Sequence, residues 1–336
     1  MKVNASLIAD LKSVPSKIKE IEAVGYDGAF SAEISNDPFF PLLLAAEHSE
    51  RVNLMTAISV AFARSPMTVA NVAHDLNQYS GGRFTLGLGS QIRPHVTKRF
   101  SMPWSKPAAR MREYVLALRA IWTCWLDGGT LDFRGEFYQH TLMTPMFVPA
   151  QRGFPAPKVM VAGVGPLMTE VAGEVADGFV AHGFTTEKYL REVTLPALDR
   201  GLQKAGRSRA DFEVSAPIIV VSGMDHAAFE ASRQFVKLQL AFYGSTPAYK
   251  SVLERHGWDE LQPELHRLSK QGAWQEMGEL ISDEVLESFA IVCEDPGQIA
   301  PRLAQRYGDL IDTWQCTVDL PDRDVQSALL RRLQHP

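Results

Sequence analysis

Side chains that could do chemistry follow several short apolar runs in this chain. The clearest case is Ser80–Ser90, where Ser-Gly-Gly precedes the apolar run Phe84–Leu88 and then Gly89 and Ser90. That order predicts a helix stop, a short strand and a glycine-rich break. Glycine at the end of a strand lets a ligand approach the backbone closely. We therefore expect a binding site where this strand ends.

A second site is predicted at the turn that follows the strand-like run Lys158–Ala162. Two glycines lie in this turn, and Pro166 fits the first turn of the next helix. Unpaired N–H groups and the helix dipole favour a phosphate there. The alternative is an ordinary tight turn, and Met168 stands where a full dinucleotide fingerprint would have its third glycine. The predicted binding residues are Ala162, Gly163, Val164 and Gly165.

The loop after Gly89 combines polar and cationic side chains. Ser90 and Gln91 come first, and four donor or cationic residues follow within seven positions, namely Arg93, His95, Lys98 and Arg99. Such a cluster suits an anionic partner. A solvated surface is the alternative interpretation.

Three residues are candidates for proton transfer: Glu33, His95 and His182. Glu33 lies at the tip of a predicted strand, and a carboxyl whose pKa is raised by burial can act as a proton donor. Asp37 competes with it, although Asp-Pro is also a common turn starter. His182 ends another predicted strand and could equally be a structural histidine. No pair among the nine histidines has metal-ligand spacing with supporting carboxylates, so we predict no metal site.

Short strand-like runs alternate with amphipathic helices along the chain. Eight such strands over 336 residues favour a closed (β/α)8 TIM barrel, as one domain over residues 1–336. Several helices at about 225–287 are predicted as an insertion after the seventh strand. Chemistry in such barrels lies at the carboxyl ends of the strands. The predicted strands are Val3–Leu7, Asp27–Ser31, Val52–Ile58, Phe84–Leu88, Lys158–Ala162, Gly178–His182, Phe212–Val221 and Ser288–Cys293.

Composition excludes several classes of protein. The formal net charge of −5 argues against a nucleic-acid binder. No apolar run approaches the roughly 20 residues of a membrane helix, and the start lacks the pattern of a signal peptide. Three widely spaced cysteines predict no disulfide framework. We therefore expect a cytoplasmic protein with neither a nucleic-acid nor a membrane partner.

The ordered set of motifs resembles the luciferase-like monooxygenase superfamily over nearly the whole chain. Within it, the chain is most similar to the branch of coenzyme F420-dependent oxidoreductases. The resemblance rests on Gly25–Gly28, Glu33, Ala45–His48, Thr56, Arg64–Pro66, Ser80–Ser90, Ala162–Pro166, Ala172–Gly178 and Pro296, and for the branch on Gly89–Gln91, the Arg110–Trp122 helix and Ala241–Gly244.

The resemblance implies a bacterial-luciferase type of TIM barrel that binds a flavin or deazaflavin ring at its mouth. Ala57 and Ile58 would back the ring, near a bulge that often holds a non-proline cis peptide; Ser59 is an alternative by one residue of register. The Gly163–Gly165 turn would hold phosphate, with His182 beside it. The remaining cofactor contacts that it implies are Ser90, Gln91 and His95 at the ring or its ribityl chain, and Arg93, Lys98 and Arg99 at the acidic tail.

Two departures from the family pattern matter. Many relatives have a catalytic histidine where this chain has Ile34, and sugar-phosphate dehydrogenases have a glutamate where it has Ile92. Neither isoleucine can transfer a proton. The replacements make the substrate side more apolar, which favours a hydrophobic substrate.

These observations predict an oxidoreductase that uses reduced coenzyme F420 for hydride transfer to or from a small organic substrate. The alternative is an FMN-dependent two-component monooxygenase served by a separate flavin reductase. A third hypothesis is a flavin-binding protein without turnover. Relatives of this kind are often dimers, so a homodimer is expected.

Overall fold

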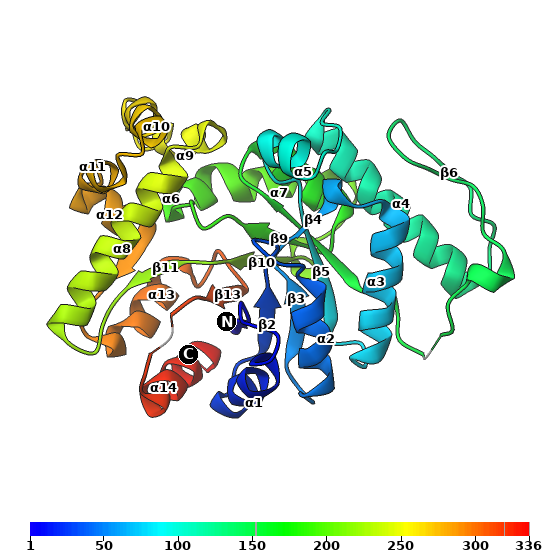
Figure 1. The fold of residues 1–336 in the computed structure, drawn as a ribbon, viewed down its shortest axis with the longest axis horizontal. Helices are drawn as coiled ribbons and strands as arrows, with labels where there is room; N and C mark the ends of the chain where they lie inside the picture. The colour runs from blue at the N-terminus through cyan, green and yellow to red at the C-terminus, as the bar shows by residue number, and fades with distance from the viewer. Residues whose placement is uncertain (152, 319, 336) are drawn as a thin grey trace.

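Eight parallel strands close into a barrel in the computed structural model, which describes residues 1–151, 153–318 and 320–335. β1 pairs with both β2 and β13, and β3 pairs with β5, so the ring has no free edge (Figure 1). This confirms the predicted TIM barrel. The barrel strands are β1 (Lys2–Ser6), β2 (Gly28–Ser31), β3 (Asn53–Thr56), β5 (Phe84–Gly89), β8 (Lys158–Gly163), β9 (Gly178–Ala181), β10 (Glu213–Ala216) and β13 (Thr313–Cys316).

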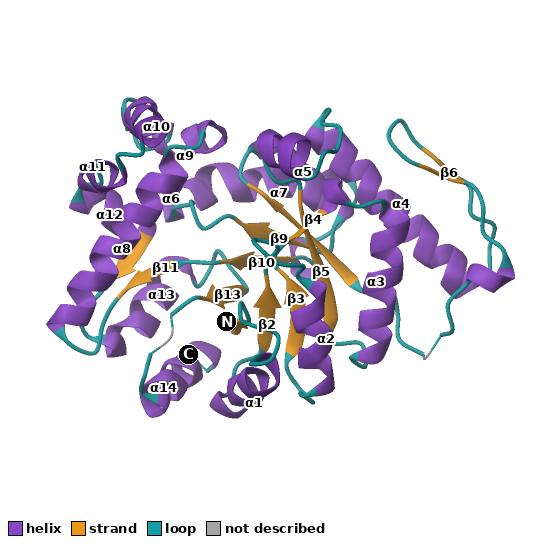
Figure 2. Cartoon of the chain, in the orientation of Figure 1, coloured by secondary structure: helices purple, strands orange, loops and turns teal. Residues whose placement is uncertain are grey.

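Helices surround this barrel (Figure 2). In α3 (Pro66–Tyr79) the Ser65 side chain accepts a hydrogen bond from the N–H of Thr68, and Val69, Ala73 and Leu76 are buried, as the helical spacing predicts. No helix in the described ranges is both long and apolar enough to cross a membrane. The other outer helices are α1 (Val14–Val24), α2 (Phe39–Glu47), α4 (Pro107–Asp127), α5 (Pro166–Val175), α6 (Glu187–Tyr189), α7 (Leu195–Lys204), α13 (Ile299–Tyr307) and α14 (Arg323–Gln334).

Five further helices follow β10 and form a separate lobe at the upper left of Figure 1. They correspond to the helical insertion expected at about 225–287. Their side chains form a hydrophobic cluster distinct from the main core, with Leu240, Leu265 and Phe289 among its buried members. The five are α8 (His226–Gly244), α9 (Lys250–Glu254), α10 (Leu261–Gln271), α11 (Trp274–Glu279) and α12 (Asp283–Phe289).

The prediction that Ser288–Cys293 forms the eighth strand of the barrel is wrong. The centre of this segment is β12 (Ala290–Val292), which pairs with β11 (Ile219–Val221) outside the barrel sheet, whereas β13 closes the ring. The seventh predicted strand accordingly divides into β10 and β11 around Pro217, whose missing N–H breaks the ladder. β13 escaped prediction because the four residues Thr-Trp-Gln-Cys form no apolar run.

A short antiparallel hairpin lies between α4 and β8. Its strands are β6 (Phe133–Arg134) and β7 (Gln139–His140), which pair antiparallel. The predicted third strand ends early, because β3 stops at Thr56 and the short β4 (Ser59–Val60) continues beside β5. The interruption falls on Ala57 and Ile58, two of the residues predicted to bind a ring.

Candidate active site

Ala57 and Ile58 lie between β3 and β4 at the barrel mouth. The peptide bond that joins them is cis, and the N–H of Ala57 donates to the carbonyl of Ser31 at 2.7 Å. Both residues are partly exposed, whereas Ser59 is fully buried. The surface available to a ligand is therefore Ala57–Ile58, and the buried Ser59 side chain does not contribute to it.

Gly89 makes room for the Ile58 side chain. A Cβ atom on Gly89 would lie 2.8 Å from Cδ1 of Ile58, which is closer than carbon atoms approach. Gly87 serves a similar purpose, because its Cβ would lie 1.9 Å from the carbonyl oxygen of Thr56. Gly87 and Gly89 of the Ser80–Ser90 run thus allow β5 to pack under the surface formed by Ala57 and Ile58.

Glu33 is only 7% exposed and is held in an ion pair with Arg64. Its carboxylate accepts hydrogen bonds from Nη1 of Arg64 at 2.7 Å and from the N–H of Val60 at 2.7 Å. Its own N–H donates to the carbonyl of Ile58 at 3.0 Å. Glu33 therefore fixes both sides of the Ile58–Val60 segment, and we refer to Glu33, Arg64 and these contacts as the clamp.

Arg64 also binds Asp37, through Nη2 at 2.8 Å. Burial by itself would lower the pKa of Arg64, but the hydrogen bonds and charges of Glu33 and Asp37 outweigh it and raise that pKa. The guanidinium therefore stays charged. Both carboxylates considered for proton transfer are engaged by this one cation, which favours a positioning role for Glu33. Sequence reasoning recognised Arg64 in a motif and missed this role.

The loop after β5 begins with Ser90 and Gln91. Gln91 has a left-handed φ of 58°, and its Oε1 accepts a hydrogen bond from the N–H of Ile92 at 3.0 Å, which supports that conformation. The guanidinium of Arg99 donates to the carbonyl of Ile34 and stacks on Phe100 at 4.9 Å. It thereby joins this loop to the end of β2.

Arg93 and His95 lie on the outer side of the same loop and are exposed. Within the described part of the chain, neither side chain has a hydrogen-bond or ion-pair partner. These two residues are therefore free to meet a ligand, but they lie farther along the loop than Ser90 and Gln91.

The Gly163–Gly165 turn leads from β8 into α5. Gly165 precedes the first helical residue, and no side chain caps the helix. The N–H groups of Leu167 and Met168 therefore lack the side-chain acceptor that they would have at a capped terminus. The turn is partly exposed, and a Cβ on Gly165 would meet nothing within 4 Å. This arrangement suits an anion such as phosphate.

His182 follows β9 and packs between aromatic rings of the insertion. Its Nδ1 accepts a hydrogen bond from the N–H of Phe184 at 2.9 Å. The ring centroids of Tyr249 and Tyr243 lie 4.4 and 5.0 Å from that of His182. Burial lowers the pKa of His182 from 6.5 to about 4. The imidazole is therefore neutral near pH 7 and carries its proton on Nε2, so it can donate a hydrogen bond but does not exchange protons there.

Tyr189 connects the turn to the insertion. Its hydroxyl lies 3.3 Å from the carbonyl oxygen of Val164, to which it donates, and 3.0 Å from the hydroxyl of Ser251 in α9. Neither Tyr189 nor Tyr249 carried a signal in the sequence; Tyr243 stood only in a motif of the resemblance.

Strand pairing brings most of the predicted residues together. Val60 of β4 pairs with Gly89 of β5, β5 pairs with β8, and Gly163 of β8 pairs with Ala181 of β9. The ends of these neighbouring strands form one arc of the barrel mouth. Along the arc lie Ala57–Ile58, Ser90–Gln91, the Gly163–Gly165 turn and His182.

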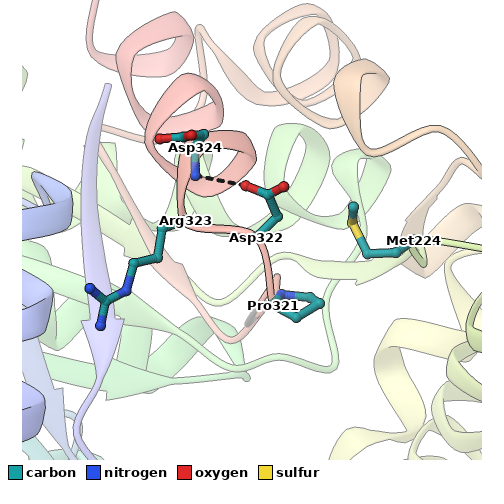
Figure 3. A pocket seen from close by; sticks show the side chains of 5 residues that line it. All are labelled: Met224, Pro321, Asp322, Arg323 and Asp324. Atoms are coloured by element: carbon teal, nitrogen blue, oxygen red, sulfur yellow. Dashed lines mark hydrogen bonds between the residues drawn. The ribbon is translucent and has the colours of Figure 1, made fainter.

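Two hollows elsewhere contain none of the predicted residues. One lies at the start of α14 and is lined by Met224 and Pro321–Asp324 (Figure 3). There Oδ1 of Asp322 accepts a hydrogen bond from the N–H of Asp324 at 2.8 Å, so this carboxylate already caps the helix. The other is an apolar groove between α2 and α3 on the outer surface. No group of three or more His, Cys, Asp or Glu side chains that could hold a metal is found in residues 1–151, 153–318 and 320–335.

Comparison with known proteins agrees with this architecture. An uncharacterized protein of Mycobacterium tuberculosis is 56% identical over 292 residues, covering 87% of this chain and 86% of that protein. The F420-dependent glucose-6-phosphate dehydrogenase of Intrasporangium calvum is 28% identical over 306 residues, covering 86% and 83%.

Solved structures share the fold at low sequence identity. The coenzyme F420-dependent tetrahydromethanopterin reductase of Methanopyrus kandleri has a TM-score of 0.77 at 20% identity, covering 99% of this chain and 96% of that one. The FMN-bound oxygenating component of 3,6-diketocamphane monooxygenase from Pseudomonas putida has a TM-score of 0.65 at 14% identity, covering 99% and 96%. The family model for luciferase-like monooxygenases matches residues 3–313. With this match over most of its length, the chain belongs to the luciferase-like monooxygenase family.

Proposed function

We propose that this protein is an oxidoreductase that uses coenzyme F420, bound across the arc of the barrel mouth. The observation that carries the proposal is the order of surfaces along that arc: an apolar surface at Ala57–Ile58, then an uncapped helix start at Gly165. A flat ring suits the first and a phosphate the second. F420-dependent relatives support the choice of cofactor.

Different residues of the arc would bind different parts of the cofactor. Ala57 and Ile58 would back the ring, and the clamp would hold them in place. Ser90 and Gln91 would border the ring, and the turn with Ala162 would bind the phosphate. Arg93 and Arg99 would lie toward the acidic tail. When bound in its reduced form, the deazaflavin supplies a hydride; the protein supplies orientation and electrostatics.

The proton candidates separate by environment. The carboxylate of Glu33 is held in an ion pair with Arg64, which favours a positioning role, and the pKa of His182 is lowered to about 4, so His182 is not suited to proton exchange near pH 7. His95 is exposed and is the candidate that we retain. We assign to His182 the role of donating a hydrogen bond through Nε2.

FMN is the second candidate, because an FMN-bound protein shares the fold and the Gly163–Gly165 turn would suit its phosphate equally well. The protein would then be a monooxygenase that receives reduced flavin from a reductase. Titration of the purified apoprotein with each cofactor, followed by protein fluorescence, separates the two. We expect tight binding of F420; tight binding of FMN without binding of F420 would overturn the first choice.

Gly165→Asp tests the phosphate site. The new carboxylate would repel the phosphate, so we expect the cofactor affinity to fall by about a hundredfold, equivalent to about 3 kcal/mol. The same carboxylate caps α5, so the melting temperature should hold or rise.

Gly165→Asn is the matched control, because it also caps the helix but adds no charge. Its cofactor affinity should stay closer to that of the unchanged protein. Equal affinities for the Asp and Asn variants would place the phosphate elsewhere.

A further inference from the structure

Two tyrosine rings that are not assigned to the cofactor pack against His182 at the end of the arc and form a wall with it. Tyr243 comes from α8 and Tyr249 from the short 3-10 helix Pro247–Tyr249, so both belong to the insertion, whereas His182 belongs to the barrel. The planes of His182 and Tyr249 are inclined by only 37°, and those of His182 and Tyr243 by 75°. We refer to these three side chains as the aromatic wall.

The wall is anchored from behind. Phe184 lies 6.3 Å from Tyr243 and 6.1 Å from Tyr249, and it stacks on Phe289 of α12 at 4.4 Å. Phe184 and Phe289 are each about 1% exposed, so they tie the wall to the core of the insertion. A surface fixed in this way can offer stacking area with little loss of side-chain entropy.

His182 supplies the wall with an N–H donor that has no protein partner in the described part of the chain. Because Nδ1 of His182 accepts from the N–H of Phe184, the ring proton sits on Nε2. Nε2 has no hydrogen-bond partner in the described residues and is not among their fully buried unpartnered atoms. It is therefore accessible to a ligand.

The rings that contact His182, those of Tyr243 and Tyr249, are uncharged. The pKa of His182 is lowered by burial alone, and no charged side chain contributes to that shift. Such surroundings disfavour an ionic ligand, because its charge would lose hydration without gaining a partner. A neutral acceptor such as a carbonyl oxygen suits a neutral N–H donor.

We propose that the aromatic wall binds the substrate, and that the substrate is a flat, uncharged carbonyl compound. Its ring packs on Tyr243 and Tyr249, and its oxygen accepts a hydrogen bond from Nε2 of His182. The inference rests on the proposed function only in calling this ligand the substrate, since His182 lies at the end of the arc where the cofactor is proposed to bind.

The test measures binding of two uncharged probes, and of 4-fluorobenzoate as a charged comparison, to the full-length apoprotein by ¹⁹F NMR line broadening. 4-Fluoroacetophenone offers a ring and a carbonyl, whereas 1-ethyl-4-fluorobenzene offers a ring of similar size without an acceptor. We expect the ketone to bind about fivefold more tightly, the usual worth of one neutral hydrogen bond. Equal affinities, or tighter binding of 4-fluorobenzoate than of the ketone, would overturn the proposal.

Variants assign the effect to the wall. His182→Phe keeps an aromatic ring but removes the donor, so the preference for the ketone should disappear. His182→Asn can accept from the N–H of Phe184 and still donate, so it should retain part of the preference and guards against a folding defect. Tyr249→Ala should weaken the binding of both probes about fivefold, whereas Tyr249→Phe should leave the binding of both unchanged. An undiminished preference in a folded His182→Phe protein would overturn the role of His182.

The two proposals fail separately. If neither F420 nor FMN binds while the probes behave as expected, the proposed function is contradicted and the aromatic wall is still supported as a ligand site. If a cofactor binds but the probes show no preference, the proposal for the aromatic wall is contradicted and the cofactor proposal is still supported.

Discussion

The two ends of the arc hold a titratable side chain in opposite ways. At the β2–β4 end, Glu33 is buried against Arg64 and accepts the N–H of Val60. At the β9 end, His182 packs between tyrosine rings and its Nδ1 accepts a hydrogen bond from the N–H of Phe184. The first residue is held by a counter-charge. The second is kept neutral by desolvation.

This comparison shows that position at a strand end does not by itself make a residue an acid or a base. Both residues lie at strand tips, where barrel enzymes place their chemistry. Yet the clamp commits the carboxylate to a cation, and the aromatic wall lowers the pKa of the imidazole. The same arc therefore separates a rigid polar support from an apolar surface that can receive a ligand.

The largest effect is expected from breaking the clamp. Glu33→Gln removes the charge that offsets the partly buried Arg64, so the free energy of unfolding should fall by about 3 kcal/mol. Urea denaturation measures this change. Asp37→Asn is the control, because Asp37 is more exposed, and should cost about 1 kcal/mol or less. Equal losses of unfolding free energy in the two variants would contradict the expectation that Glu33 contributes more to stability than Asp37.

Lowering the pH should destabilise the protein because of His182, which lies at the other end of the arc. An unfolded His182 binds a proton below its ordinary pKa of 6.5, whereas the folded residue stays neutral down to about pH 4. The unfolded state thus binds more protons in this window, and stability falls as the pH drops from 6.5 to 4. We expect a loss of roughly 1–2 kcal/mol, reduced from the full shift because the ring is partly exposed.

The measurement compares urea denaturation of the unchanged protein and of His182→Asn at several pH values. The variant cannot titrate at this position, so the difference in unfolding free energy between the two proteins should change between pH 6.5 and 4. A constant difference would mean that His182 is not kept neutral in the folded state.

Gly89→Ala tests the close contact between Gly89 and Ile58, which lies between the two ends of the arc. The added methyl would meet Cδ1 of Ile58, so we expect a loss of about 1 kcal/mol in unfolding free energy. Adding Ile58→Ala should recover part of that loss, and the double-mutant cycle measures the coupling. Gly129→Ala is the control, since nothing lies within 4 Å of its Cβ position. Additive losses for Gly89 and Ile58 would exclude the proposed contact.

The smallest effect is expected where the turn meets the insertion. Tyr189→Phe removes the hydroxyl that binds the carbonyl of Val164 and the hydroxyl of Ser251. The free energy of unfolding should fall by about 0.5–1 kcal/mol, since both partners are only partly buried. Ser251→Ala should give a smaller loss. A larger loss for Ser251→Ala would show that the link to Val164 contributes little.

Much of the arrangement of the candidate site could be predicted, because parallel strands bring their carboxyl ends to one rim. Once Phe84–Leu88, Lys158–Ala162 and Gly178–His182 are strands, their following loops must be neighbours. The resemblance placed the Ala57–Ile58 surface, and the exposures favour that register over Ser59. The homodimer, the reductase partner and the cytoplasmic location stay predictions.

What could not be read from the chain depends on contacts between distant residues. Arg64 meets Glu33 across 31 positions, and Tyr249 reaches His182 from a different lobe. The sequence showed a carboxylate and a histidine at strand tips, but gave no measure of their surroundings. The strand that closes the barrel was missed for a related reason: β13 is defined by its pairing with β1 and β10 rather than by an apolar run.

The sequence by itself determined the alternation of strands and helices, the family, and the turns that end β5 and β8, because these depend on neighbours a few residues apart. Only the tertiary structure decided what each polar residue can do. Charge and proton affinity depend on the dielectric and on partners brought close by folding, so Glu33 became part of a clamp and His182 a neutral donor.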